Sequence, residues 1–264
     1  MHSHDKHIEA VCKMMQSFAF RHDLHNLFSD CIEAAAIALS NSVDLVSRDA
    51  REKRYLEIVG RYERDVVDMF PNVLGEVVLA LDVEPGDVLG AIYSELGLQS
   101  AARGQYFTPY SVCRLSAEVM VGKGEQINEI ILRHGFVCAQ EPTCGAGAMI
   151  VALAEALRAR GINYQQHLHV TAIDIDPRAV HMAYIQLTLM HIPAVVIVGN
   201  SLSMEMREYW YTPAHILGRW SGKLILRGAE EAALALINPP AEPSTSTEPP
   251  AQSEGRERRQ LRLF

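Results

Sequence analysis

Three short apolar runs alternate with helix-like segments in the middle of the chain. The runs are Gly135–Ala139, His169–Ile173 and Ala194–Val198, and each is typical of a strand in a buried parallel sheet. The segments between them, residues 150–159 and 178–191, keep apolar residues at helical spacing. This order predicts an α/β fold with an open parallel sheet flanked by helices, in which the loops of interest follow the carboxyl ends of the strands.

The first part of the chain has a different pattern. Residues 7 to about 80 show helical periodicity with few turn signals, most clearly at 32–39, 55–70 and 73–81. A chain of 264 residues with 48% hydrophobic content can bury a sizeable core. The pattern therefore predicts a helical N-terminal region, a partial α/β domain and a tail, at residues 1–100, 101–240 and 241–264.

The end of the chain is less regular. Residues 214–237 are typical of alanine- and leucine-rich helices, although Ala235-Leu236-Ile237 could form a short strand. Residues 241–250 are rich in Pro, Ser, Thr and Glu and are predicted to be disordered. One edge of the sheet would be exposed or covered by helices around the aromatic segment Tyr209–His215. That segment could also line a pocket or face a partner, but covering the edge is the simplest role.

A glycine turn joins the first apolar run to the helix-like segment after it. The turn spans Glu141–Met149, and Gly145 and Gly147 would let its backbone bend sharply and bring N–H groups close to a ligand at the helix N-terminus. Many such turns contain glycine for geometry alone. Asp174, at the tip of the second run, favours a binding site, because a carboxylate there can accept hydrogen bonds from both hydroxyls of a ribose.

The turn differs from the known phosphate-binding loops. Ile150 stands where the third glycine of a dinucleotide motif is expected, and the chain has no G-x-x-x-x-G-K-[ST] sequence. A carboxylate at Glu141 would repel a pyrophosphate but could pair with an ammonium group. S-adenosylmethionine has an ammonium group, a ribose and an adenine and lacks phosphate, so it fits these residues better than a dinucleotide.

Three motifs in the same order resemble those of a known family. Glu141–Gly147 (E-P-T-C-G-A-G) is similar to the cofactor motif of the N6-adenine-specific DNA methyltransferases, in particular the methylation subunits of type I restriction-modification systems. Gly104–Pro109 (G-Q-Y-F-T-P) and Asp87–Leu96 (D-V-L-G-A-I-Y-S-E-L) resemble two segments that precede it in that family. The resemblance covers residues 87–202 and implies a Rossmann-like sheet that binds S-adenosylmethionine, in a chain that is truncated relative to the family.

The resemblance also implies roles for individual residues. Thr108 would bind the methionine carboxylate, Glu141 the ammonium group and Asp174 the ribose, while Asp176 would cap the next helix. Asn200 stands where the family often has an aspartate that reads the adenine amino group, and an amide oxygen can accept the same hydrogen bond. The full set of expected cofactor residues is Tyr106, Thr108, Glu141, Cys144, Gly145, Gly147, Asp174 and Asn200.

The expected catalytic residues rest on a single short motif. The family holds a flipped-out adenine with [DN]-P-P-[FYW], and this chain offers Asn238-Pro239-Pro240 with Ala241 in the aromatic position. The motif also borders the proline-rich tail, where Asn-Pro-Pro can occur without a catalytic role. Two hypotheses stay open: an adenine-specific DNA methyltransferase or methylation subunit, and a cofactor-binding accessory protein of a modification or anti-restriction system that has lost transfer. Methylation of RNA or protein is a third, weaker option.

Charge and composition bear on partners and location. The net charge of -8 argues against tight DNA binding by this chain alone. A partner or specificity subunit would therefore supply most of the DNA contacts, and the chain would act in a homo- or hetero-oligomer. An arginine cluster at residues 256–262 could add a weak phosphate-seeking arm or a solubilising end. Five cysteines without a C-x-x-C pair indicate reduced thiols in the cytoplasm. No metal site is expected from the histidines near the N-terminus, and no membrane span from the short apolar runs.

Overall fold

A computed structural model describes residues 4–99 and 108–237 of the chain. Its contacts divide the chain into a large unit, Met1–Ile225, and a small unit that begins at Leu226. The described part of the small unit is residues 226–237, which belong to helix α12 (Trp220–Ile237). The sheet and the described residues of the candidate site lie in the large unit.

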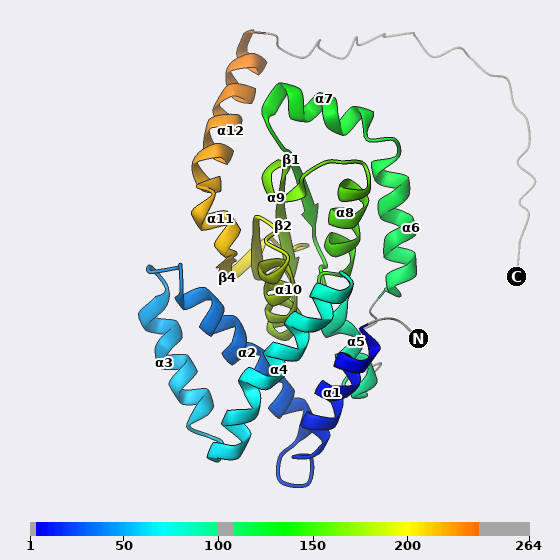
Figure 1. Cartoon of the computed structure of the whole chain (residues 1–264). Helices are drawn as coiled ribbons and strands as arrows, with labels where there is room; N and C mark the ends of the chain where they lie inside the picture. Colours follow the sequence, from blue (N-terminus) through cyan, green and yellow to red (C-terminus); the bar gives the residue numbers. More distant parts are fainter. Residues whose placement is uncertain (1–3, 100–107, 238–264) are drawn as a thin grey trace, which may run out of the picture. The chain divides into compact units, whose positions relative to one another are not determined.

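A four-stranded sheet is the centre of the large unit. Strands β1 (Val137–Glu141), β2 (Leu168–Asp174) and β3 (Ala194–Asn200) are parallel neighbours, as the three apolar runs predict. The fourth strand, β4 (Glu205–Tyr211), pairs antiparallel with β3, so the order is β1-β2-β3-β4 (Figure 1). The predicted α/β class with an open sheet flanked by helices is confirmed.

Two crossover helices connect the parallel strands. Helix α8 (Ala148–Ala159) and the short α9 (Tyr164–His167) lead from β1 to β2, and α10 (Pro177–Leu189) leads from β2 to β3. Right-handed crossovers in a sheet of this order place α8 and α10 on the same face. Asp176 caps α10 by accepting from the Arg178 N–H at 3.1 Å, and Pro177 opens the helix, both as the sequence predicts.

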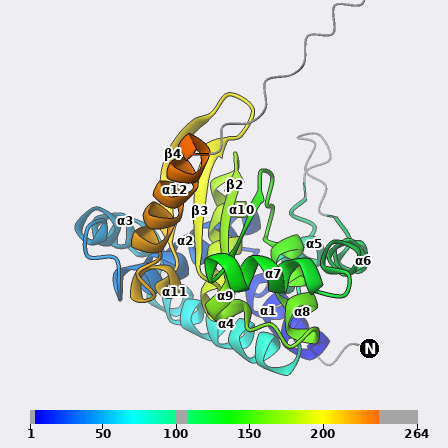
Figure 2. The ribbon, with the colours of Figure 1, turned by 90° about the horizontal axis from the view of Figure 1, so that it is seen from above.

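The aromatic segment near Tyr209 forms a strand, where the sequence suggested helices. As part of β4 it covers the outer edge of β3, so the expected edge-covering role is confirmed and the expected helical form is wrong. Only Trp210 of this strand is buried, against His181 and Tyr184 of α10, which explains why the segment lacks a clear strand pattern. Its hairpin loop with β3 extends beyond the other strand ends in Figure 2.

The N-terminal helices pack around the lower end of the sheet as seen in Figure 1. Residues 55–70, expected as one continuous helix, belong to two helices that are separated by a turn at residues 60–63. Gly60 ends the first helix and Glu63 has an extended backbone, so the chain turns between them. The helical spacing of apolar residues in the sequence continues across this turn, which made the two helices look like one. The helices before β1 are α1 (Asp5–Gln16), α2 (Leu24–Asn41), α3 (Arg48–Val59), α4 (Arg64–Val83), α5 (Val88–Glu95), α6 (Tyr110–Val121) and α7 (Glu125–His134).

Arg51 of α3 joins this helical region to β4. Its guanidinium lies 4.0 Å from the ring centroid of Trp210 and donates a 2.8 Å hydrogen bond to the Tyr209 carbonyl. It also forms a 2.7 Å ion pair with the buried Asp44. The helices and the sheet are therefore connected by polar contacts as well as by a shared hydrophobic core.

The segment after β4 is helical, as predicted. Helix α11 (Pro213–Leu217) is followed by α12, and residues 235–237 belong to α12, so the suggested short strand there is wrong. Alanine and leucine have the strongest helix propensities, which agrees with a continuous helix over this run. The division at residue 100 stays a prediction, and the tail from residue 241 lies outside the described residues. Among the described helices, none combines the length and apolar character that crossing a membrane requires.

Candidate functional site

Three polar side chains lie at the carboxyl ends of the parallel strands. Glu141 ends β1 in register with Ala172, Asp174 ends β2 in register with Val198, and Asn200 lies two residues beyond Val198 on β3. Register partners share a face, and side chains two residues apart on a strand point the same way. The side chains of Glu141, Asp174 and Asn200 therefore project from the same face of the sheet. Asp174 and Asn200 each lie two residues farther along the strand than the register partner of the one before, and all three are half-buried.

The glycine turn follows β1 directly. Gly145 and Gly147 both have positive φ, at 53° and 96°, and Gly147 is the residue that caps α8. A Cβ added at Gly147 would lie 3.4 Å from both Cα and Cβ of Ala183 on α10. Position 147 thus needs glycine for its backbone conformation and for the close approach of two helices.

Three N–H groups of the turn are used within the fold. Cys144 donates to the Ile173 carbonyl at 2.8 Å, and Gly145 donates to Asp174 Oδ2 at 2.9 Å. Gly147 donates back to the Cys144 carbonyl at 2.8 Å. The expectation that the glycines present their N–H groups to a ligand is therefore wrong for Gly145 and Gly147, because the end of β2 and the turn itself accept the hydrogen bonds.

The two carboxylates keep capacity for further hydrogen bonds. Asp174 Oδ1 accepts from the Asp176 N–H at 2.9 Å, and Glu141 Oε1 accepts from the Thr143 N–H at 3.3 Å. A carboxylate has about four acceptor positions in total, so each side chain can accept from a ligand as well. Burial raises the pKa of Asp174 above its usual value, against the lowering effect of its backbone hydrogen bonds. The site is rich in acceptors and suits a ligand that carries hydroxyl or ammonium donors.

Two buried cysteines lie close to the carboxylates. Burial raises the pKa of the Cys144 thiol well above its usual value, and the charges of Asp174 and Glu141 raise it further. Cys113 of α6 is affected in the same way, by burial and then by Asp87 and Glu141. Both therefore stay protonated and pack as small apolar side chains, which argues against a thiolate nucleophile.

Thr108 comes just before α6, at the first described position after residue 107. Its carbonyl accepts a weak hydrogen bond from Cys113 Sγ at 3.8 Å. Ala117 and Met120 of α6 line the same small pocket as Glu141, so α6 passes close to the end of β1. The Thr108 side chain is exposed and is accessible to a ligand there.

Asn200 has a defined side-chain orientation. Its Oδ1 accepts from the N–H groups of Leu202 at 2.9 Å and Ser203 at 3.2 Å, in the turn between β3 and β4. Only the oxygen can accept these two hydrogen bonds, so the amide nitrogen occupies the other position. For a ligand, Asn200 therefore offers its Nδ2 as a donor, because its oxygen already accepts two hydrogen bonds.

Residues outside the predicted set hold the loops of the site. Arg207 is the extra residue of the β-bulge in β4, and it donates to the Ile175 carbonyl at 3.0 Å, which fixes the loop after Asp174. Arg178 pairs with Asp176 at 2.8 Å and also contacts His25 of α2. Gln186 of α10 contacts the turn itself through the Ala146 carbonyl. The sequence gives no local signal for these contacts, since each joins elements far apart in the chain.

The remaining predicted residues have no described position. Tyr106 and the proposed catalytic residues Asn238, Pro239 and Pro240 lie outside the described residues. The structure thus brings together Glu141, Cys144, Gly145, Gly147, Asp174 and Asn200.

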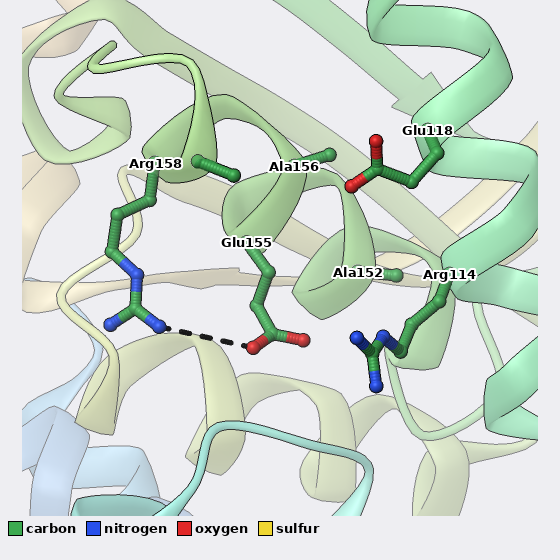
Figure 3. Close-up of a pocket in the computed structure, with 7 residues that line it drawn as sticks. Arg114, Glu118, Ala152, Glu155, Ala156 and Arg158 are labelled. Atoms are coloured by element: carbon green, nitrogen blue, oxygen red, sulfur yellow. Dashed lines mark ion pairs between the residues drawn. The ribbon is translucent and has the colours of Figure 1, made fainter.

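One surface pocket is separate from this cluster. It has a volume of about 280 Å³ and lies between α6 and α8, where Figure 3 shows Arg114 and Glu118 on one side and Glu155 and Arg158 on the other. Glu118 pairs with Arg160, and Glu155 pairs with Arg158 at 3.9 Å. These charges neutralise one another at an exposed surface, so the pocket is a solvated groove. A smaller pocket of about 50 Å³ includes Glu141, with apolar walls from α6 and α8.

Potential metal ligands are scattered. Within residues 4–99 and 108–237, no three His, Cys, Asp or Glu side chains lie together in a way that could hold a metal ion. The five cysteines are present as thiols, and four of them are buried.

Comparison with known proteins identifies one related family. The sequence model of a family described as N-6 DNA Methylase matches residues 84–218, just over half of the chain. The matched region begins before α5 and ends after α11, so it includes the whole sheet and the turn. No curated protein and no solved structure matches the chain.

Proposed function

The chain belongs to the N-6 DNA methylase family, and on that premise we propose that it binds S-adenosylmethionine at the ends of β1, β2 and β3. Family membership implies a DNA substrate. We propose specifically that the chain methylates N6 of adenine, as a methyltransferase or as the methylation subunit of a complex. DNA binding then depends on a partner or specificity subunit, because the net charge of the chain is -8.

The observation that carries this proposal is the internal use of three N–H groups of the turn, those of Cys144, Gly145 and Gly147. Loops that bind the phosphates of nucleotides offer backbone N–H groups to the ligand. Here Cys144, Gly145 and Gly147 donate to groups of the protein, and the side chains beside them are carboxylates. This arrangement disfavours a pyrophosphate and supports a ligand with an ammonium group and ribose hydroxyls.

The proposed roles follow from the position of each residue. Glu141 accepts from the ammonium group of the methionine part, and Asp174 accepts from the ribose hydroxyls while it holds Gly145. Gly147 leaves space that a side chain would fill, and Cys144 packs beneath the turn. Thr108, with Tyr106 before it, reaches the methionine carboxylate.

S-adenosylmethionine, when bound, supplies an activated methyl group on a positively charged sulfur. The protein's contribution is to hold the target amino group in place, which we assign to Asn238 and the Pro239-Pro240 segment after it. The Asn side-chain oxygen and a backbone carbonyl accept from the amino group and orient it, so that position and electrostatics supply most of the rate.

A second function is favoured by one departure from the family pattern. Ala241 occupies the position of the aromatic residue that stacks on the flipped base, so part of the base-holding site is missing from the sequence. A chain that binds the cofactor without transferring its methyl group would act as an accessory protein of a DNA-modification or anti-restriction system.

Two measurements test these alternatives. Calorimetry with purified chain is expected to show binding of S-adenosylmethionine that Asp174→Ala abolishes, because this change removes the ribose acceptor and the hydrogen bond to Gly145. Transfer of labelled methyl groups to unmethylated DNA is expected for the wild type and not for Asn238→Ala.

The outcomes separate the proposals. A wild type that shows no cofactor binding would overturn the cofactor assignment. Binding without transfer to DNA, in the presence and absence of partner chains, would leave the accessory role. Transfer to RNA or protein in place of DNA would overturn the substrate assignment only.

The side chain of Asn200 allows a separate prediction. Since its oxygen accepts from Leu202 and Ser203, we propose that its Nδ2 donates to a ring nitrogen of the cofactor's adenine. Asn200→Asp keeps both turn hydrogen bonds but removes the donor, so the dissociation constant measured by calorimetry should rise about tenfold. If Asn200 accepted from the adenine amino group, as the family resemblance implies, aspartate would bind equally well or better.

Asn163 offers a matched control for that change. Its side chain accepts from the Gln165 N–H at 3.1 Å at the start of α9, as Asn200 does in its own turn. Asn163→Asp should leave cofactor binding unchanged.

A further inference from the structure

Gln186 connects the cofactor turn to a helix of the N-terminal region. Its side chain is completely buried on α10. Nε2 donates to the Ala146 carbonyl at 2.7 Å and to Asp87 Oδ1 at 3.1 Å, while Oε1 accepts from the Leu89 N–H at 3.1 Å. One amide therefore joins α10, the start of α5 and the turn between β1 and α8.

The orientation of this amide is fixed by its partners. The backbone N–H of Leu89 can only donate, so the oxygen of Gln186 must face it. The amide nitrogen then faces the two acceptors, Asp87 Oδ1 and the Ala146 carbonyl. Asp87 is itself held as the cap of α5, where its carboxylate accepts from the Gly90 N–H at 3.0 Å. Both N–H bonds of the Gln186 amide are thus used, inside an apolar core.

The contact with Ala146 complements the hydrogen bonds described for the turn. Ala146 is buried and lies between the two glycines with positive φ. Ile173 and Asp174 hold the N–H groups of Cys144 and Gly145 from the side of β2. Gln186 holds the next carbonyl from the side of α10, so the turn is fixed from two directions.

We propose that Gln186 is a positioning residue for cofactor binding: through the Ala146 carbonyl it sets the conformation of the Gly145–Gly147 turn, and Asp87 keeps its amide in the required orientation. The inference rests on the proposed cofactor site. It adds a residue that has no contact with the ligand and that belongs to none of the three sequence motifs.

The test separates positioning of the turn from a general contribution to the core. Gln186→Glu replaces the amide nitrogen with oxygen at nearly constant size. As a carboxylate, residue 186 can no longer donate to the Ala146 carbonyl, and it also faces the Asp87 carboxylate. Gln186→Glu combined with Asp87→Asn removes the repulsion between two carboxylates at residues 87 and 186, since asparagine is neutral and its Oδ1 can still cap α5. The double variant leaves Ala146 without its donor.

The expected results differ between stability and binding. Gln186→Glu should lower stability in urea and weaken binding of S-adenosylmethionine about 30-fold in calorimetry. The double variant should regain most of the urea stability while its binding stays at least about tenfold weaker than that of the wild type. Gln165→Glu is the control for binding, because it makes the same chemical change and removes a hydrogen bond from the amide nitrogen to a backbone carbonyl, that of Met190, at an exposed residue away from the turn.

Two results would overturn the inference. One is unchanged binding in Gln186→Glu, and the other is parallel recovery of stability and binding in the double variant, which would indicate a structural role only. A wild type without cofactor binding would overturn the proposed function instead. Amide hydrogen exchange then still decides the role of Gln186: Gly145 and Gly147 should exchange faster in Gln186→Glu than in Gln165→Glu, and equal rates would refute it.

Discussion

Replacing Gly147 with valine is expected to abolish measurable binding of S-adenosylmethionine. The backbone at this position has φ of 96°, which a β-branched residue adopts only at high cost. The new Cβ would also lie 3.4 Å from Ala183 on α10, and the two methyl groups of valine would extend into α10 or into the space proposed for the methionine part of the cofactor. Calorimetry on the purified variant, after circular dichroism has verified folding, measures the loss.

A matched pair of alanine variants separates backbone strain from loss of space. Gly161 has φ of 73°, and an added Cβ there meets no atom within 4 Å. Gly161→Ala and Gly147→Ala should each lose roughly 1 kcal/mol or more of stability through the left-handed backbone. Only Gly147→Ala should also weaken binding. A folded Gly147→Val protein that binds within threefold of the wild type would contradict the proposed position of the ligand.

A steep loss of stability in mild acid is the second large effect that we expect. His169, His181 and His215 are buried, and burial lowers the pKa of each to about 4. His169 and His215 also share a 2.9 Å hydrogen bond, which needs one neutral nitrogen as acceptor. In the unfolded chain these side chains take up protons near pH 6.5.

The loss of stability in acid follows from the lowered pKa values of these three histidines. Between about pH 6.5 and pH 4 the unfolded chain binds more protons than the folded chain, so the free energy of unfolding falls as the pH falls. Each histidine contributes a slope of up to about 1.4 kcal/mol per pH unit. Urea denaturation at intervals from pH 7.5 to pH 4.5 measures the summed slope.

One variant identifies the source of this slope. The Nε2 atom of His181 is buried without a hydrogen-bond partner in the described residues, and its ring packs against Trp210. His181→Phe should therefore fold at pH 7.5 with little loss of stability, and its slope should be shallower than that of the wild type. Stability that stays constant down to pH 5 in the wild type would show that these histidines are protonated in the folded chain.

The sequence alone predicts the parts of the fold that have continuous apolar runs. Strands β1, β2 and β3 are of this kind, because parallel strands are buried on both faces. Strand β4 was missed, since Trp210 is its only buried residue and the other residues of the strand are exposed or half-buried. The helix expected at residues 55–70 was wrong because Gly60 interrupts an apolar period that continues into the next helix.

The candidate site shows the same limit at the level of single atoms. The sequence indicates the acidic residues and glycines because they occur in a recognisable local order. It does not indicate that Gly145 donates to Asp174, 29 residues away, or that Gln186 reaches Asp87, 99 residues away. Such partners depend on which strands and helices become neighbours, and that information is spread over the whole chain.

The hydrogen bonds of the Cys144–Gly147 turn also limit how this site could be redesigned. Exchanging Glu141 for a neutral residue would remove the repulsion toward a phosphate, but it would not release the N–H groups of Cys144, Gly145 and Gly147. Two of these groups donate to backbone carbonyls, those of Ile173 and Cys144, and the third donates to the Asp174 side chain. A phosphate that used these three groups would therefore need a new backbone path at Cys144 and Gly147 as well as a change at residue 174.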